Sequence, residues 1–161
     1  MPEMTVLGWF HTILGILAVL SGFYTLYKYK IITTEESSGK LYVLVTLLVA
    51  GSALGIYNQG GFGIAHVLAV LTLIALAGGY IMEKFKWFGS FSKYFQALGY
   101  TSTLLFHMIP AITDFLRRLP VGDPFIDSFE DPLLLNFHTA FLVIYLVGLV
   151  TQMVWLKRQA N

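Results

Sequence analysis

Five long apolar segments constrain this chain more than any other feature of its sequence. Each contains roughly 17–24 residues, the length that an α-helix needs to cross about 30 Å of hydrocarbon. The segments run from about Thr5 to Tyr27, Leu41 to Tyr57, Phe62 to Met82, Phe95 to Leu116 and Leu133 to Leu156. The connections between them are too short for a second domain. The sequence therefore predicts an all-α transmembrane bundle of five membrane-spanning helices, a single domain over residues 1–161.

The composition excludes several classes of protein. Hydrophobic residues make up 57% of the chain and charged residues 12%, about half the charged fraction of an average soluble protein. This excludes water-soluble enzyme folds and disordered chains, and the net charge of +1 predicts no nucleic-acid partner. The expected partner is instead the lipid bilayer. There is no cysteine, so disulfides, thiolate metal sites and thioether attachment of a haem are excluded.

The distribution of Lys and Arg predicts the orientation. Eight of the ten basic residues lie in the first and third connections or after the last segment. The other two, Arg117 and Arg118, lie in the fourth connection. Because basic residues accumulate on the cytoplasmic side of membrane proteins, we expect the N-terminus outside and the C-terminus inside.

The four histidines are the candidate site residues. With the predicted topology, His11, His66, His107 and His138 each lie on a different segment, roughly 6–14 Å below the outer boundary of the membrane. Ionisable side chains within a membrane are uncommon and are usually functional, and imidazole is the commonest metal ligand. The alternative is that each histidine is a hydrogen-bonded residue between packed helices.

Two further features favour a flat cofactor. Gly15, Ala18 and Gly22 follow His11 on one helical face, where small side chains let a porphyrin, or simply another helix, approach the backbone. Arg117 and Arg118 could pair with haem propionates in the same outer layer. The alternative partners of these arginines are the acidic residues of their own loop: Asp123, Asp127, Glu130 and Asp131.

Several short motifs resemble those of an uncharacterised family of small bacterial multi-pass membrane proteins. They are Trp9–His11, Ser38–Val43, Gly60–His66, and Pro110–Pro120 with Asp131–Pro132. The resemblance covers most of the chain and implies the bacterial cytoplasmic (inner) membrane, but no settled activity. Relatives often carry a histidine where Ser37 and Ser38 stand here. In architecture the predicted bundle is also similar to b-type cytochromes with four or five helices, whose haem is held by histidines from two helices.

These observations support three hypotheses. In the first, two of the histidines ligate haem b in the outer half of the membrane, and the protein exchanges electrons between a membrane quinol and a partner at the outer face. In the second, His11, His66, His107 and His138 hold zinc or copper in a hydrolase, a transporter or a metallochaperone. In the third, the protein is a structural or assembly subunit without a cofactor. The sequence leaves open whether the chain forms a homo-oligomer.

Overall fold

The computed structural model describes residues 4–57 and 61–160, and every regular element in this part of the chain is a helix. The predicted all-α class is therefore confirmed. The elements are α1 (Val6–Tyr29), α2 (Ser37–Ala53), α3 (Ile64–Phe85), the short 3-10 helix η1 (Gly89–Phe91), α4 (Ser92–Arg118) and α5 (Pro132–Ala160).

Helix α2 differs most from its predicted bounds. It begins at Ser37 rather than Leu41 and ends at Ala53 rather than Tyr57. It starts earlier because the polar residues that precede the apolar segment form its first turn. It ends earlier because a tight turn follows, in which the amide of Gly55 donates to the carbonyl of Ser52. Most of the connection predicted after it, residues 58–60, lies outside the described residues.

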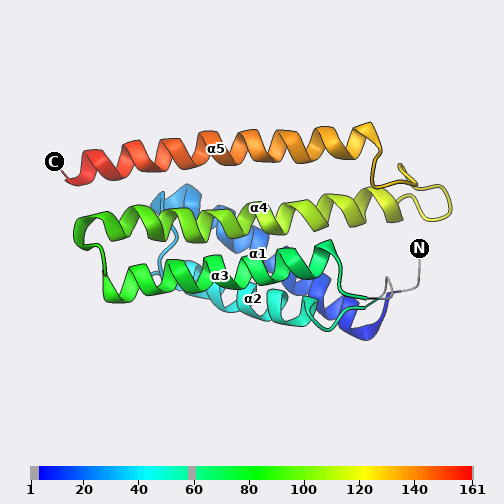
Figure 1. Ribbon diagram of the computed structural model, residues 1–161, viewed down its shortest axis with the longest axis horizontal. Helices are drawn as coiled ribbons and strands as arrows, with labels where there is room; N and C mark the ends of the chain where they lie inside the picture. The colour runs from blue at the N-terminus through cyan, green and yellow to red at the C-terminus, as the bar shows by residue number, and fades with distance from the viewer. Residues whose placement is uncertain (1–3, 58–60, 161) are drawn as a thin grey trace.

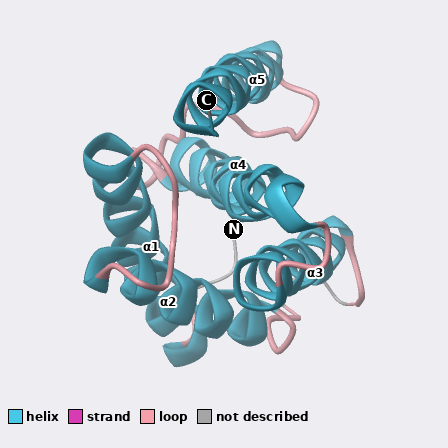
Figure 2. Ribbon diagram, turned by 90° about the vertical axis from the view of Figure 1, so that its left-hand side faces the viewer, coloured by secondary structure: helices cyan, strands magenta, loops and turns pink. Residues whose placement is uncertain are grey.

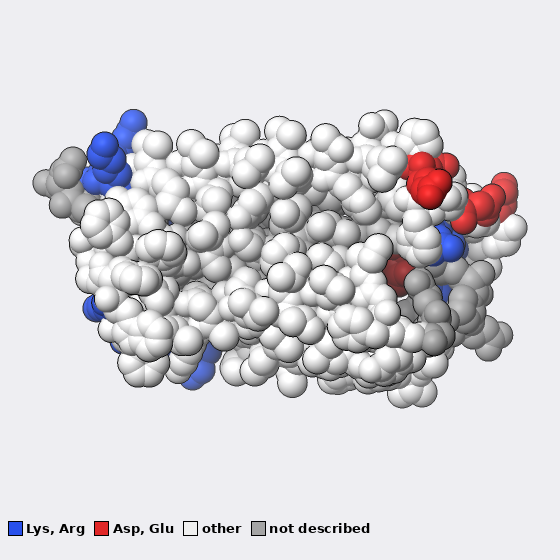
Figure 3. Space-filling model, in the orientation of Figure 1, with Lys and Arg blue, Asp and Glu red and all other residues white. Residues whose placement is uncertain are grey.

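The five long helices lie side by side and alternate in direction, so the two termini are at opposite ends (Figure 1). We call the end where α1, α3 and α5 begin the histidine end, and the end where they finish the lysine end. Figure 3 shows Lys and Arg side chains at the lysine end, Asp and Glu side chains together with further basic ones at the other end, and a long uncharged surface between them. A long uncharged surface between two charged ends is typical of a chain that crosses a bilayer.

Three helices, α1, α3 and α5, are long and apolar enough to cross a membrane. Helix α2 is apolar but has only 17 residues. Helix α4 has 27 residues and carries more polar side chains than the others, because it is the central helix. It packs against α3, α5 and α1, and Figure 2 shows it between α5 and the other three.

Helix α5 packs chiefly against α4, so most of its surface is exposed and apolar. The side chains that it turns toward the bundle recur every three or four residues, as one face of a helix requires. They are Leu134, His138, Phe141, Tyr145, Leu149, Gln152 and Leu156. The remaining apolar side chains of α5 face outward, where a bilayer would cover them.

Helices α3 and α4 cross so closely that one glycine is required at the contact. A Cβ atom added at Gly99 would lie 2.7 Å from the carbonyl oxygen of Ala75 and 2.9 Å from the backbone nitrogen of Gly79. Neither backbone atom can move independently of its helix. A Cβ atom added at Gly51 on α2, by contrast, would meet no atom within 4 Å.

We therefore predict that Gly99→Ala destabilises the protein by about 1–3 kcal/mol, the usual cost of overpacking. Gly51→Ala is the matched control and should leave stability unchanged or slightly raised, because alanine favours the helix. Thermal unfolding in detergent, followed by circular dichroism, measures both. Equal melting temperatures for the two variants would contradict the close crossing.

Candidate functional site

His11 lies on α1 and is oriented by helix α2. Its Nδ1 atom is 3.1 Å from the carbonyl oxygen of Val49 and 3.1 Å from the hydroxyl of Ser52. A carbonyl oxygen only accepts, so Nδ1 carries the proton and donates it to Val49. In the neutral ring, Nε2 is then the basic nitrogen, available to a proton or a ligand.

His107 lies on α4 and is buried in the bundle. Its Nε2 atom is 3.1 Å from the hydroxyl of Thr46 on α2, and its ring meets the ring of Tyr42 edge-on at a centroid distance of 6.3 Å. Two side chains of α2 therefore fix the orientation of this imidazole. The position of His107 on the central helix puts it opposite His11.

The two imidazoles line one partly open cavity of about 70 Å³, to whose walls all four helices α1 to α4 contribute. The cavity walls are otherwise small or apolar, with Ala50 of α2, Ala69 of α3 and Pro110 of α4 among them. Each water molecule in the liquid occupies about 30 Å³, so the cavity has room for about two. The ring nitrogens supply the polar partners that such waters need.

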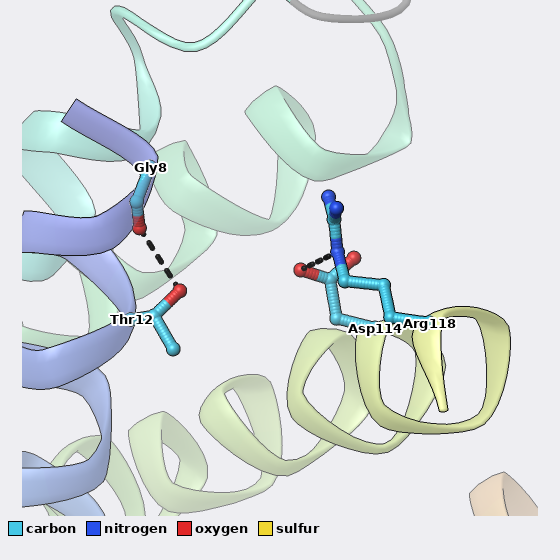
Figure 4. Close-up of polar contacts among 4 residues, drawn as sticks. All are labelled: Gly8, Thr12, Asp114 and Arg118. Carbon is cyan, nitrogen blue, oxygen red and sulfur yellow. Dashed lines mark hydrogen bonds and ion pairs between the residues drawn. The ribbon is translucent and has the colours of Figure 1, made fainter. Parts of the chain in front are cut away.

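A carboxylate lies near this cavity at the histidine end. Asp114 is two turns beyond His107 on α4, it interacts electrostatically with His11, and its Oδ2 atom is 3.4 Å from Nε of Arg118. Figure 4 shows Thr12 of α1 and Asp114 of α4 on facing helices, with Arg118 beside Asp114. The Asp114 side chain is half exposed, so this carboxylate is in contact with the surroundings of the bundle.

The other two histidines do not line the cavity. The Nδ1 atom of His66 accepts a hydrogen bond of 3.1 Å from the amide of Gly63, and the ring stacks on Phe62. His138 is held at the contact of α5 with α4, where its Nε2 atom is 3.2 Å from the hydroxyl of Thr113. The structure thus brings together His11 and His107 and keeps His66 and His138 apart from them.

A line of buried hydroxyl groups continues from His107 toward the middle of the bundle. Thr46, which contacts His107, lies near the hydroxyl of Tyr42. That hydroxyl is 2.5 Å from the hydroxyl of Thr103, which in turn donates to the carbonyl of Tyr100. Tyr42, Thr46 and Thr103 are all fully buried, so their hydroxyl groups depend on other protein groups for hydrogen bonds.

A second buried polar cluster lies near the lysine end around Glu83. Its Oε1 atom accepts hydrogen bonds from the hydroxyl of Thr33 and from the amide and hydroxyl of Thr34, and Oε2 accepts one of 2.8 Å from the hydroxyl of Tyr100. Four donors therefore satisfy a carboxylate that is only 8% exposed. Glu83 was not among the site residues predicted from the sequence. A carboxylate directly after an apolar segment was nevertheless an available signal.

The same end of the bundle holds two amide side chains that tie the α1–α2 connection in place. Gln96 of α4 donates to the carbonyl of Ile32, and Gln152 of α5 donates to the carbonyl of Lys30. Gln152 also accepts from the hydroxyl of Thr101. Together with Glu83, these residues attach one connection to three helices.

An apolar layer of packed side chains surrounds the contact between the two polar clusters. Leu76 lies between Thr72 and Glu83 along α3, and Leu104 lies between Tyr100 and His107 along α4. Both leucines are buried and belong to the main hydrophobic core. Within this layer Tyr100 contacts both clusters, because its carbonyl accepts from Thr103 and its hydroxyl donates to Glu83.

The arginines make contacts that the sequence did not predict. Arg118 pairs with Asp114 on its own helix. The guanidinium group of Arg117 lies over the ring of Phe129, 3.8 Å from its centroid. The small residues of α1 also have a packing role, because a Cβ atom added at Gly22 would lie 2.7 Å from the ring of Tyr42.

No cavity of haem size lies between His11 and His107. Sites for cofactors and drug-sized ligands usually measure about 300–1,000 Å³, whereas the cavity between His11 and His107 measures about 70 Å³. Within residues 4–57 and 61–160, no three His, Asp or Glu side chains gather closely enough to hold a metal ion. The haem and the zinc or copper hypotheses therefore gain no support from this geometry.

A scan against protein-family models found no match, and searches of the curated proteins and of the solved structures found no significant similarity. The predicted resemblance to a bacterial membrane family therefore stays a prediction. The proposed function therefore depends on the two polar clusters alone.

We predict that Glu83→Ala lowers stability by about 1–3 kcal/mol or more, because it leaves buried donors of Thr33, Thr34 and Tyr100 without an acceptor. Glu35→Ala, in the same connection but exposed, is the control and should change stability by less than about 0.5 kcal/mol. Chemical unfolding in detergent compares them, and limited proteolysis shows whether the α1–α2 connection is released. A stable, protease-resistant Glu83→Ala variant would show that this carboxylate does not hold the connection.

Proposed function

We propose that this chain is an integral protein of the bacterial cytoplasmic membrane, with five spans, the N-terminus outside and the C-terminus inside. Alternating helix directions and eight of ten basic residues at the lysine end support this orientation. Helices α2 and α4 are included as spans because α2 packs against α1 and α3, and α4 lies between α3 and α5. Their polar residues then face protein rather than lipid.

Within that frame, the proposed function is proton transfer between the two ends of the bundle. The observation that carries it is the pair of imidazoles, His11 and His107, at one water-sized cavity connected to buried hydroxyl groups. Chains of histidine and carboxylate side chains inside a membrane are the usual components of proton relays. A cofactor is not needed for this chemistry, and the cavity is of the right size for water.

Each residue has a role in this mechanism. Asp114, partly exposed, exchanges protons with the surroundings of the histidine end and is electrostatically coupled to His11. The basic Nε2 atom of His11 takes up the proton, and water in the cavity passes it to His107. From His107 the hydroxyls of Thr46, Tyr42 and Thr103 lead toward the apolar layer.

Glu83 is the proton acceptor on the far side of that layer. Its Oε2 atom accepts from the hydroxyl of Tyr100 inside the bundle. Its Oε1 atom accepts from Thr33 and Thr34 in the α1–α2 connection at the lysine end. The leucine side chains at 76 and 104 limit the passage, so transfer requires their displacement or transient water between them. A slow, gated proton flux is therefore expected rather than an open pore.

The three earlier hypotheses remain distinguishable from this proposal. A bis-histidine haem protein would show an absorbance near the Soret region that shifts on reduction with dithionite. A zinc or copper protein would contain the metal in stoichiometric amounts by elemental analysis. A structural or assembly subunit would show neither property and no proton flux.

The proposed orientation is tested with reporters fused after Asn161. Alkaline phosphatase, which is active only outside the cytoplasmic membrane, should be inactive there, and a fluorescent protein that folds in the cytoplasm should be bright. An active phosphatase at this position would overturn the orientation, because an odd number of spans must place the two termini on opposite sides.

Proton transfer is tested in liposomes that contain a pH-sensitive dye and carry a potassium gradient with valinomycin. We predict that His11→Gln and His107→Gln each reduce the initial proton flux by about tenfold or more, since a positioned proton-transfer group typically contributes about 10²–10⁴ in rate. Glutamine keeps a hydrogen-bonding amide but cannot take up a proton.

The matched control is His138→Gln. It changes the same residue type at the contact of α5 with α4, outside the cavity. It should transport protons at the rate of the parent protein. A parent flux equal to that of protein-free vesicles would refute the proposed function, as would equal effects of all three substitutions.

A further inference from the structure

A second, larger hollow lies on the surface between α3 and α4. It measures about 370 Å³ and is lined by Leu71, Ile74 and Gly78 from α3 and by Phe95, Gly99 and Ser102 from α4, among others. It lies beside the close crossing of the two helices at Gly99, where no side chain fills the space above Gly78. The proton-transfer mechanism does not use this groove.

The groove presents almost only carbon atoms. Its one hydroxyl group, on Ser102, donates to the carbonyl of Leu98 at 2.7 Å and lies 2.8 Å from the hydroxyl of Tyr145 on α5. Since the Ser102 proton is committed to the carbonyl, Ser102 accepts from Tyr145, and both groups are already bonded within the protein. The surface of the groove therefore suits a hydrocarbon chain rather than a polar ligand.

The length of the groove matches one layer of a bilayer. From Leu71 to Met82 along α3 it extends about 16 Å, at 1.5 Å per residue. The hydrocarbon core of a bilayer is about 30 Å thick, so each leaflet contributes about half of it. One acyl chain, lying parallel to the helices, has the length that the groove offers.

Basic side chains follow the groove at the lysine end of the bundle. Lys86 comes directly after α3, four residues after Met82, and is exposed. Lys84 lies in the last turn of α3 and Lys93 in the first turn of α4. Among the described residues no carboxylate forms an ion pair with Lys86. An anionic group at the surface of the membrane would be attracted to this position.

We propose that the groove between α3 and α4 binds one acyl chain of an anionic phospholipid of the surrounding bilayer, with the lipid phosphate at Lys86. The site rests on the proposed membrane insertion but not on proton transfer. Charge complementarity selects the head group, and the depth of the groove holds the chain. Lipid from the leaflet at the lysine end is therefore retained when bulk lipid is removed.

The test is native mass spectrometry of the detergent-purified full chain after addition of phosphatidylglycerol or phosphatidylcholine. The parent should retain one phosphatidylglycerol, about tenfold more tightly than phosphatidylcholine, which corresponds to about 1.4 kcal/mol. Gly78→Leu should fill the groove and abolish this retention without disturbing the fold, because a Cβ atom added at Gly78 meets no atom within 4 Å. Gly148→Leu, on the exposed face of α5 and equally unobstructed, is the matched control.

A second pair of variants tests the head group. Lys86→Asn should remove the preference for phosphatidylglycerol while a phospholipid of either kind still binds, and asparagine tolerates the left-handed conformation that Lys86 adopts at a φ of 50°. Lys40→Asn, at the same end of the bundle but on α2, should behave as the parent. Proton flux is measured in parallel, so that loss of lipid retention and loss of flux are separate results.

Three results would overturn the proposal. They are equal retention of the two lipids by the parent, unchanged retention by Gly78→Leu, and a change in oligomeric state in Gly78→Leu without loss of lipid. The last result would indicate that a second copy of the chain, rather than a lipid, occupies the groove.

Discussion

The cost of leaving a polar group without a partner in an apolar medium determines how this bundle is assembled. Each unsatisfied hydrogen-bonding group in hydrocarbon costs several kcal/mol, so polar side chains must be enclosed by protein. Helix α4 carries most of these side chains and is the helix that α1, α3 and α5 surround. Helix α5 has few of them, and it lies at the edge with most of its surface exposed. The polarity of each helix thus sets its position.

The same constraint divides the interior into two polar clusters. Buried hydroxyls near His107 are satisfied by Tyr42, Thr46 and Thr103, and Glu83 is satisfied by the connection that it anchors. Between these clusters leucine and other apolar side chains pack around Tyr100, which contacts both of them. Charge is therefore better stabilised at either end of the bundle than in its middle, as the proposed gated transfer requires.

The sequence predicted the helices well, because length and hydropathy are local properties. It also identified His11 and His107, because an ionisable residue inside an apolar segment stands out. It missed Glu83 and Tyr42, whose partners lie between 17 and 61 residues away in the chain. Such contacts depend on which helices become neighbours, and no local pattern contains that information. The ion pair of Arg118 with Asp114 was also missed, although the two residues are one turn apart on the same helix.

Four histidines that are equivalent in the sequence become chemically different through their hydrogen bonds. His11 donates from Nδ1 to the carbonyl of Val49, which leaves Nε2 basic. His66 instead accepts at Nδ1 from the amide of Gly63, so its neutral ring carries the proton on Nε2. The hydroxyl of Thr113 donates to Ile109, so His138 donates to Thr113 and also carries its proton on Nε2. The amide of Gly63 therefore fixes His66 as an acceptor at Nδ1, and the hydroxyl of Thr113 fixes His138 as a donor at Nε2. The carbonyl of Val49, near the end of α2, instead leaves His11 with its basic nitrogen at Nε2. That difference, rather than depth in the membrane, separates His11 from the two histidines outside the cavity.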